Sequence, residues 1–168
     1  MTKDAARADD PMKDSNGNDA IATIETIYRL DWERDYALGL ERVWTAISDE
    51  NEITAWMRFA TRLEPRVGGA IHIDFSSQGF LDGVVCNLEA PNLLIYTWGD
   101  SLVKWNLEGD GSKTTLRLSH IGVRPELMAG MGAGWHAFLD HLEDHLTGSS
   151  RPDRYRELKG RYEKEVPS

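Results

Sequence analysis

The stretch that decides the fold is GWHAFLDHLEDHLTG, residues 134–148, close to the C-terminal end of the chain. Its large apolar residues recur every three or four positions: Trp135, Phe138, Leu139, Leu142 and Leu146. This spacing places them on one stripe of an α-helix, and Gly148 is typical of a helix C-terminus. We therefore predict a long amphipathic helix that begins near Gly130 to Gly134 and needs an apolar surface to cover.

Upstream of this helix, six short runs are separated by turn residues and show no helical spacing: 59–64, 70–75, 81–89, 93–98, 102–108 and 113–121. Gly, Pro, Asn and Asp fill the gaps between them, as expected for turns. Starts of successive runs lie about ten residues apart, which favours antiparallel pairing of neighbours. The sequence therefore predicts a meander of six strands.

The segment before this meander predicts one more strand and two short helices. Apolar residues alternate in the first part, interrupted by Thr26 and Arg34: Ile24, Tyr28, Leu30, Trp32, Tyr36 and Leu38. Helical spacing follows at Leu40, Val43, Trp44 and Ile47, and then at Ile53, Trp56 and Met57. Ser48 or Asp49 supplies the N-cap of the second helix.

A sheet of about seven antiparallel strands has one face that must be covered, and only the last helix is long enough to cover it. We therefore predict an α+β helix-grip fold, in which a curved sheet wraps around the long C-terminal helix. Residues 1–20 are predicted to be a disordered acidic tail and residues 21–148 the folded domain. The charged extension 149–168 carries Tyr155, Leu158 and Tyr162 at helical spacing, and it either docks as a short helix or stays solvated.

Composition and charge exclude several classes of function. The chain has 168 residues and a net charge of −9, the wrong sign for a nucleic-acid partner. Its single cysteine, Cys86, cannot form an intrachain disulfide and is expected to be a small buried side chain. No segment has the apolar core of a signal peptide or the length of a membrane span. We expect a cytoplasmic protein without a membrane span.

Several local motifs occur in the order of one known family. They are Arg42-Val43-Trp44 with Ala46, Trp56, PRVGG at 65–69, GVV at 83–85, LIYTW at 94–98, TTLRLSH at 114–120 and Gly134-Trp135. Over about residues 27–148 the chain resembles the activator of heat-shock protein 90 ATPase homologue family of the START-like (SRPBCC) superfamily. The family commonly has an Ala-Pro-Pro-like turn before the first helix, where this chain has Leu38-Gly39-Leu40.

The resemblance implies a cavity between the long helix and the sheet, but it does not fix an activity. Strand alternation and helical spacing direct nine side chains toward that space: Trp32, Arg34, Trp56, Phe75, Trp105, His120, Trp135, Phe138 and Leu139. As a ligand pocket, they would offer aromatic walls with His120 and Arg34 as polar groups. As a filled core, they would pack on each other, with the polar groups satisfied internally.

Three function classes stay open. The first is a non-enzymatic domain that binds a hydrophobic, lipid-like or polyketide-like small molecule. The second is a protein-interaction module that binds a chaperone or forms a homodimer. The third is a cyclase or hydratase that uses His120 as acid or base and Arg34 as oxyanion stabiliser.

Other site types find little support in the sequence. His141 and His145 have the spacing of helical zinc ligands, but no third ligand is recognisable, and a solvated polar helix face is the alternative. No nucleophile elbow, phosphate loop or dinucleotide fingerprint is present, and no cofactor is predicted. The glycines Gly130, Gly132 and Gly134 are predicted to form a hinge at the start of the long helix.

Overall fold

The computed structural model describes residues 27–166, so the predicted acidic tail over residues 1–20 lies outside the described residues. Seven antiparallel strands form one sheet in the order β1-β7-β6-β5-β4-β3-β2. Their bounds are β1 Arg29–Tyr36, β2 Ala60–Leu63, β3 Ala70–Asp74, β4 Phe80–Glu89, β5 Leu93–Trp98, β6 Ser101–Gly109 and β7 Thr114–Ile121. The helices are α1 Leu40–Ser48, α2 Glu50–Met57, α3 Met128–Thr147 and α4 Tyr155–Glu165.

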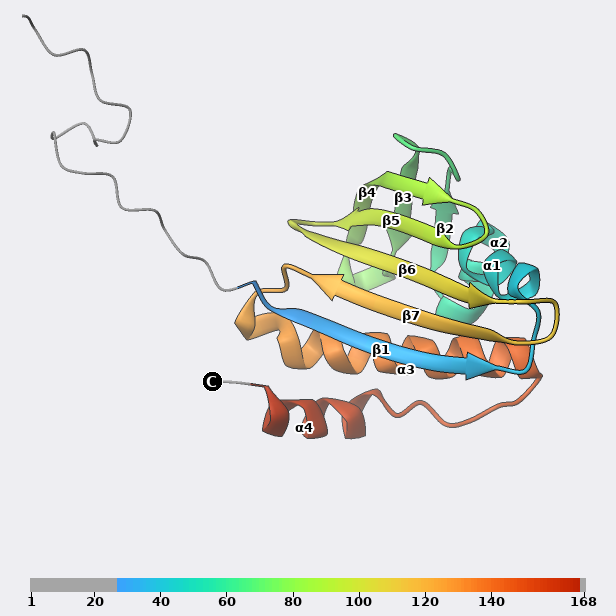
Figure 1. Ribbon diagram of the computed structural model, residues 1–168. Coiled ribbons are helices and arrows are strands. Elements are labelled where there is room, and N and C mark those ends of the chain that lie inside the picture. The colour runs from blue at the N-terminus through green and yellow to red at the C-terminus, as the bar shows by residue number, and fades with distance from the viewer. Residues whose placement is uncertain (1–26, 167–168) are drawn as a thin grey trace, which may run out of the picture.

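The predicted helix-grip fold is confirmed. The curved sheet wraps around α3, and α1 and α2 lie together between β1 and β2 in the chain (Figure 1). Asp49 is the N-cap of α2, where its Oδ1 accepts hydrogen bonds from the amides of Asn51 and Glu52 at 3.0 Å. Among residues 27–166, no helix is long and apolar enough to cross a membrane.

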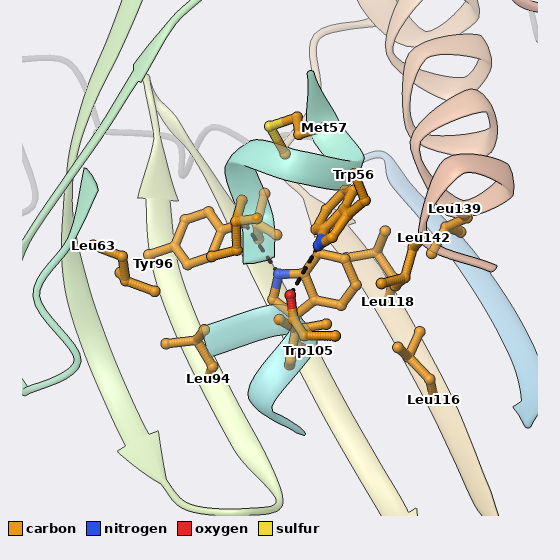
Figure 2. Close-up of a cluster of buried hydrophobic side chains, with 14 of the residues drawn as sticks. Trp56, Met57, Leu63, Leu94, Tyr96, Trp105, Leu116, Leu118, Leu139 and Leu142 are labelled. Atoms are coloured by element: carbon orange, nitrogen blue, oxygen red, sulfur yellow. Dashed lines mark hydrogen bonds between the residues drawn. The ribbon is translucent and has the colours of Figure 1, made fainter. Parts of the chain in front are cut away.

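The core lies between the sheet and the helices, and its centre is aromatic. Figure 2 shows Trp56 of α2 beside Trp105 of β6, with ring centroids 6.2 Å apart. The Trp56 indole donates to the carbonyl oxygen of Ala46 at 2.8 Å, and the Trp105 indole donates to the hydroxyl of Tyr96 at 3.1 Å. Both buried N–H groups are thus satisfied within the core, which removes the cost of burying them.

The C-terminal segment docks on the domain as a helix. Leu158 of α4 is buried against Ala133 and Ala137 of α3. The Tyr162 hydroxyl accepts a hydrogen bond from the Trp32 indole at 2.9 Å and lies 3.1 Å from His136 Nδ1. Of the two alternatives left open by the sequence, the structure shows the docked helix.

The predicted solvated polar face of α3 is wrong, because the C-terminal segment covers it. Asp140 and Asp144 are only 5% and 7% exposed. Arg151 reaches Asp144 at 2.9 Å and Glu143 at 2.7 Å, and Arg154 reaches Asp140 at 3.0 Å. The buried carboxylates are therefore paired with arginines from the extension, as buried charges require.

The expectation that Cys86 is buried is also wrong, because its side chain is exposed. Along β4 the inward positions are Leu81 and Val85, which places Val84 and Cys86 on the outer face. A β-bulge then shifts the pairing register with β5 between Val85 and Asn87. The expectation that Cys86 is buried placed the inward face one residue out of step with the observed one. A shift of one residue along a strand turns a side chain to the opposite face.

Gly130, Gly132 and Gly134 lie inside α3. The hinge that the sequence predicted at these glycines is therefore a regular part of the helix. At Gly132 a Cβ atom would lie 2.6 Å from the ring of Tyr162, so the absence of a side chain lets α4 approach closely. At Gly134 a Cβ would meet nothing within 4 Å.

We expect Gly132→Ala to lower the free energy of unfolding by about 1–2 kcal/mol, because α4 must move to admit the methyl group. The matched variant Gly134→Ala should raise it by about 0.5–1 kcal/mol, since alanine favours the helix and has room. Urea denaturation of both variants tests the pair. Equal effects of the two substitutions would show that α4 does not pack on Gly132.

Candidate functional site

A cleft of about 570 Å³ opens between α3, the C-terminal end of α2, the β3–β4 connection and the C-terminal segment. Its volume is typical of small-molecule sites. Aromatic and apolar side chains make up most of the wall, and a few polar side chains complete it. The lining consists of Met57, Arg58, Phe59, Phe75, Gln78, Trp98, Gly130, Met131, Gly134, Ala137, Phe138, His141, Asp153 and Tyr155.

Four aromatic rings of the wall contact one another or a shared partner behind it. Phe59 lies 5.1 Å from Phe75 and 6.2 Å from Phe138, measured between ring centroids. Phe75 lies 5.9 Å from Trp98, and Trp98 lies 5.0 Å from the buried Trp135. These half-buried rings are held by edge-to-face and tilted contacts, so the wall is formed before any ligand enters.

The predicted site residues divide between this wall and the core behind it. Phe75 and Phe138 line the cleft. Trp56, Trp105, Trp135 and Leu139 are at most 2% exposed and pack behind the wall. Trp135 supports it directly, with its ring centroid 5.8 Å from that of Phe138. These buried residues therefore position the wall and do not reach the cleft.

His120 is fully buried, and both its ring nitrogens are occupied. The Trp135 indole donates to Nδ1 at 2.9 Å, and Nε2 lies 2.7 Å from the hydroxyl of Ser101. Because an indole N–H can only donate, the proton of the neutral ring sits on Nε2 and is donated to Ser101. The Ser101 hydroxyl in turn donates to the carbonyl oxygen of Trp98 at 2.6 Å. Burial lowers the pKa of His120 to about 4, so the ring is neutral at pH 7.

Trp32 and Arg34 lie on β1, away from the cleft. Trp32 bonds to Tyr162 of α4, and the Arg34 guanidinium donates to the carbonyl oxygen of Glu33 at 2.9 Å. In the β1–β7 pairing, Leu30 is opposite His120 and Arg34 is opposite Leu116. Four residues of strand separate the two pairs, about 13 Å at the usual rise. The structure therefore does not bring His120 and Arg34 together.

The charged and titratable groups of the cleft come from the end of α2, from α3 and from the C-terminal segment. His141 of α3 lines the cleft and is 8% exposed, and its Nδ1 has no hydrogen-bond partner among residues 27–166. Burial, and then the positive charge of Arg58, lower the pKa of His141, so the ring is neutral at pH 7. Arg58 and Asp153 supply one positive and one negative side chain to the same lining.

Arg58 has an unusual backbone. It is the C-cap of α2 and adopts the left-handed conformation, with φ 64° and ψ 22°. For a residue with a Cβ this conformation costs about 1 kcal/mol, whereas glycine adopts it freely. The turn directs the chain from α2 into β2 and places Arg58 on the lining of the cleft.

The two histidines with zinc-like spacing have separate partners. His145 Nε2 lies 2.8 Å from Glu52, which also accepts a hydrogen bond from Arg42 at 2.9 Å. Burial raises the pKa of Glu52, but the hydrogen bonds from His145 and Arg42 outweigh burial and lower it. His141 faces the cleft instead. No group of three metal-binding side chains occurs in the part of the chain that the structure describes.

Sequence reasoning missed several lining residues. Trp98 and Met131 line both the cleft and a neighbouring hollow of about 230 Å³. The direction of Trp98 was left open because it ends a strand, where alternation is least informative. Asp153 and Tyr155 come from the extension, whose docking the sequence did not decide. Arg58 follows a helix, and no periodic pattern marked it.

Comparison with known proteins agrees with the fold. Residues 37–147 match the family model described as activator of Hsp90 ATPase homolog 1-like protein. No curated protein matches the chain. Among solved structures, CalU16 from Micromonospora echinospora is 24% identical with a TM-score of 0.71, over 83% of this chain and 89% of CalU16.

Two further structures are similar. The protein encoded by gene BPP1335 from Bordetella parapertussis is 22% identical with a TM-score of 0.73, over 88% of this chain and 90% of that one. DynU16, a protein of the dynemicin biosynthetic locus, is 25% identical with a TM-score of 0.63, over 74% of this chain and 50% of DynU16. The family match spans most of the described fold, and the chain therefore belongs to the activator of Hsp90 ATPase homolog 1-like family of the START-like superfamily.

Proposed function

We propose that this protein binds a hydrophobic or aromatic small molecule, of the lipid or polyketide kind, without transforming it. The observation that carries the proposal is the preformed cleft of about 570 Å³ with five aromatic side chains in its wall. Aromatic rings supply large contact areas and lose little conformational freedom on binding. The membership of the similar DynU16 in a biosynthetic locus is consistent with handling small molecules.

The geometry favours binding over catalysis. General acid–base chemistry needs paired groups within hydrogen-bond reach of the reacting atoms. His120 already bonds to Trp135 and Ser101, and Arg34 is four strand residues away from it. The cleft itself presents mostly carbon atoms. We therefore rank the cyclase or hydratase hypothesis below ligand binding.

The cleft can be filled by one substitution. We expect Gly134→Leu to weaken binding of the neutral fluorophore phenylnaphthylamine at least tenfold, because the new side chain occupies space that is open in the native protein. Thermal stability should not fall, since leucine is a better helix former than glycine. Fluorescence titration of both proteins measures the change.

Gly160→Leu is the matched control. Gly160 lies in α4 and is not part of the cleft lining, and a Cβ atom at this position would meet nothing within 4 Å. This variant should bind the fluorophore as the native protein does. Native binding by Gly134→Leu would place the ligand elsewhere and contradict the proposed function.

A further inference from the structure

The cleft lining has one positive side chain, Arg58. Arg58 makes no ion pair with any residue that the structure describes. Two arginines of the neighbouring C-terminal segment, Arg151 and Arg154, are committed to Asp140, Glu143 and Asp144. Within residues 27–166, Arg58 is therefore the arginine of the cleft lining that is available to a ligand.

His141 gives the second observation at the same place. The ring is more than nine-tenths buried, lines the cleft, and leaves Nδ1 without a hydrogen-bond partner within residues 27–166. Nδ1 itself is enclosed by the protein, so the other ring nitrogen, Nε2, is the one that a ligand in the cleft can reach. With the proton of the neutral ring on Nε2, this atom can donate a hydrogen bond to a ligand oxygen. Arg58 lines the same cleft, and of the charged side chains it has the largest effect on His141. A ligand in the cleft can therefore contact both side chains.

The negative side chain of the lining is less available. Asp153 Oδ1 accepts a hydrogen bond from the amide of Tyr155 at 2.8 Å, which fixes the carboxylate at the start of α4. Its charge acts on His141 less than that of Arg58 does. Asp140 and Asp144 also act on His141, but both are paired with Arg151 or Arg154. The larger effect of Arg58 than of Asp153 supports an anionic ligand group at this place.

We infer that the ligand is an aromatic or lipid-like acid, whose oxyanion pairs with Arg58 and hydrogen-bonds to His141 while its apolar body lies on the aromatic wall. This inference rests on the proposed function and specifies the class of ligand. Guanidinium is suited to the oxyanion because it donates several hydrogen bonds in one plane. The body of the ligand extends toward Phe75 and Trp98, which line the same cleft.

Two fluorophores that differ by one anionic group test the inference. Anilinonaphthalene sulfonate carries a sulfonate on the ring system of neutral phenylnaphthylamine. We expect Arg58→Gln to weaken binding of the sulfonate about tenfold and to change binding of the neutral compound less than twofold. Arg58→Lys, which keeps the charge, should restore most of the sulfonate affinity.

Arg62→Gln is the matched control, because Arg62 is also exposed, lies on β2, and is absent from the cleft lining. It should leave both affinities unchanged. If Arg58→Gln changes neither affinity, or weakens both compounds equally, the inference is overturned while the proposed function stands. If neither compound loses affinity on Gly134→Leu, binding lies outside the cleft and both proposals fail.

Discussion

Replacing Arg151 with methionine is expected to lower the free energy of unfolding by about 3 kcal/mol. The substitution leaves Asp144, 7% exposed, without the guanidinium that bonds it at 2.9 Å. Removing one partner of a buried ion pair costs about 3–5 kcal/mol, because the other charge stays buried. The lower end applies here, since the Arg151 side chain is 31% exposed and water screens part of the interaction.

A double-mutant cycle separates the ion pair from the packing of the arginine stem. Asp144→Asn should cost much less in the Arg151→Met background than in the native protein, because the buried charge has then been removed with its partner. Urea denaturation of the four proteins gives the coupling free energy. Purely additive costs would show that Arg151 and Asp144 do not interact, and that the cost of Arg151→Met comes from packing or from the ion pairs with Asp140 and Glu143.

Arg156→Met is the control on the same segment. Arg156 is exposed and forms no ion pair within the described part of the chain, so the expected change is within about 0.5 kcal/mol.

Loss of Arg151 should also detach the segment that carries Asp153 and Tyr155, two residues of the cleft lining. Hydrogen exchange of the α4 amides would detect this detachment.

The fold could be predicted because each element carries its own periodic signal. The apolar stripe of α3 and the alternation in the strands predicted the bounds of most elements to within two residues. The helix itself was longer than expected, because Gly130 and Gly132 argue locally against a helix. Contact with Tyr162 of α4 accounts for Gly132, and such a contact between distant segments leaves no local signal.

The site was harder to predict, since aromatic residues in the core and in a cleft wall share the same spacing. Trp135 and Phe138 lie three residues apart on α3, yet Trp135 is 2% exposed and Phe138 reaches the cleft. The difference depends on where Trp98 and the C-terminal segment lie, which is a property of the tertiary structure. Likewise, the spacing of Asp140 and Asp144 in the sequence is typical of surface residues. In the structure both are buried, because Arg151 pairs with them.

Acidification from pH 7 to pH 4 is expected to remove about 3 kcal/mol of stability through His120 alone. The pKa of this residue is about 4 in the folded protein, against 6.5 in its ordinary state. Between these values the unfolded chain binds a proton that the folded protein does not. Stability is therefore fully present above pH 6.5, falls with pH through this window, and is lost as pH reaches about 4.

The geometry explains why the folded protein resists protonation. A proton on Nδ1 would face the Trp135 indole N–H, which already occupies that position at 2.9 Å, and the charge would lie in a fully buried site. In His120→Gln the side-chain oxygen can accept from Trp135 and the amide can donate to Ser101, without titrating. The variant is expected to be less stable at pH 7 but to lose less stability on acidification.

The decisive quantity is the difference between the two stability curves. Carboxylates titrate in both proteins, so their contribution cancels when the pH dependence of the variant is subtracted from that of the native protein. The remainder should be a single transition between pH 6.5 and 4. Parallel curves would show that His120 has the same pKa in the folded and the unfolded protein. In that case the Trp135–His120–Ser101 chain, and with it the support of the aromatic wall at Trp98, would differ from the structure described.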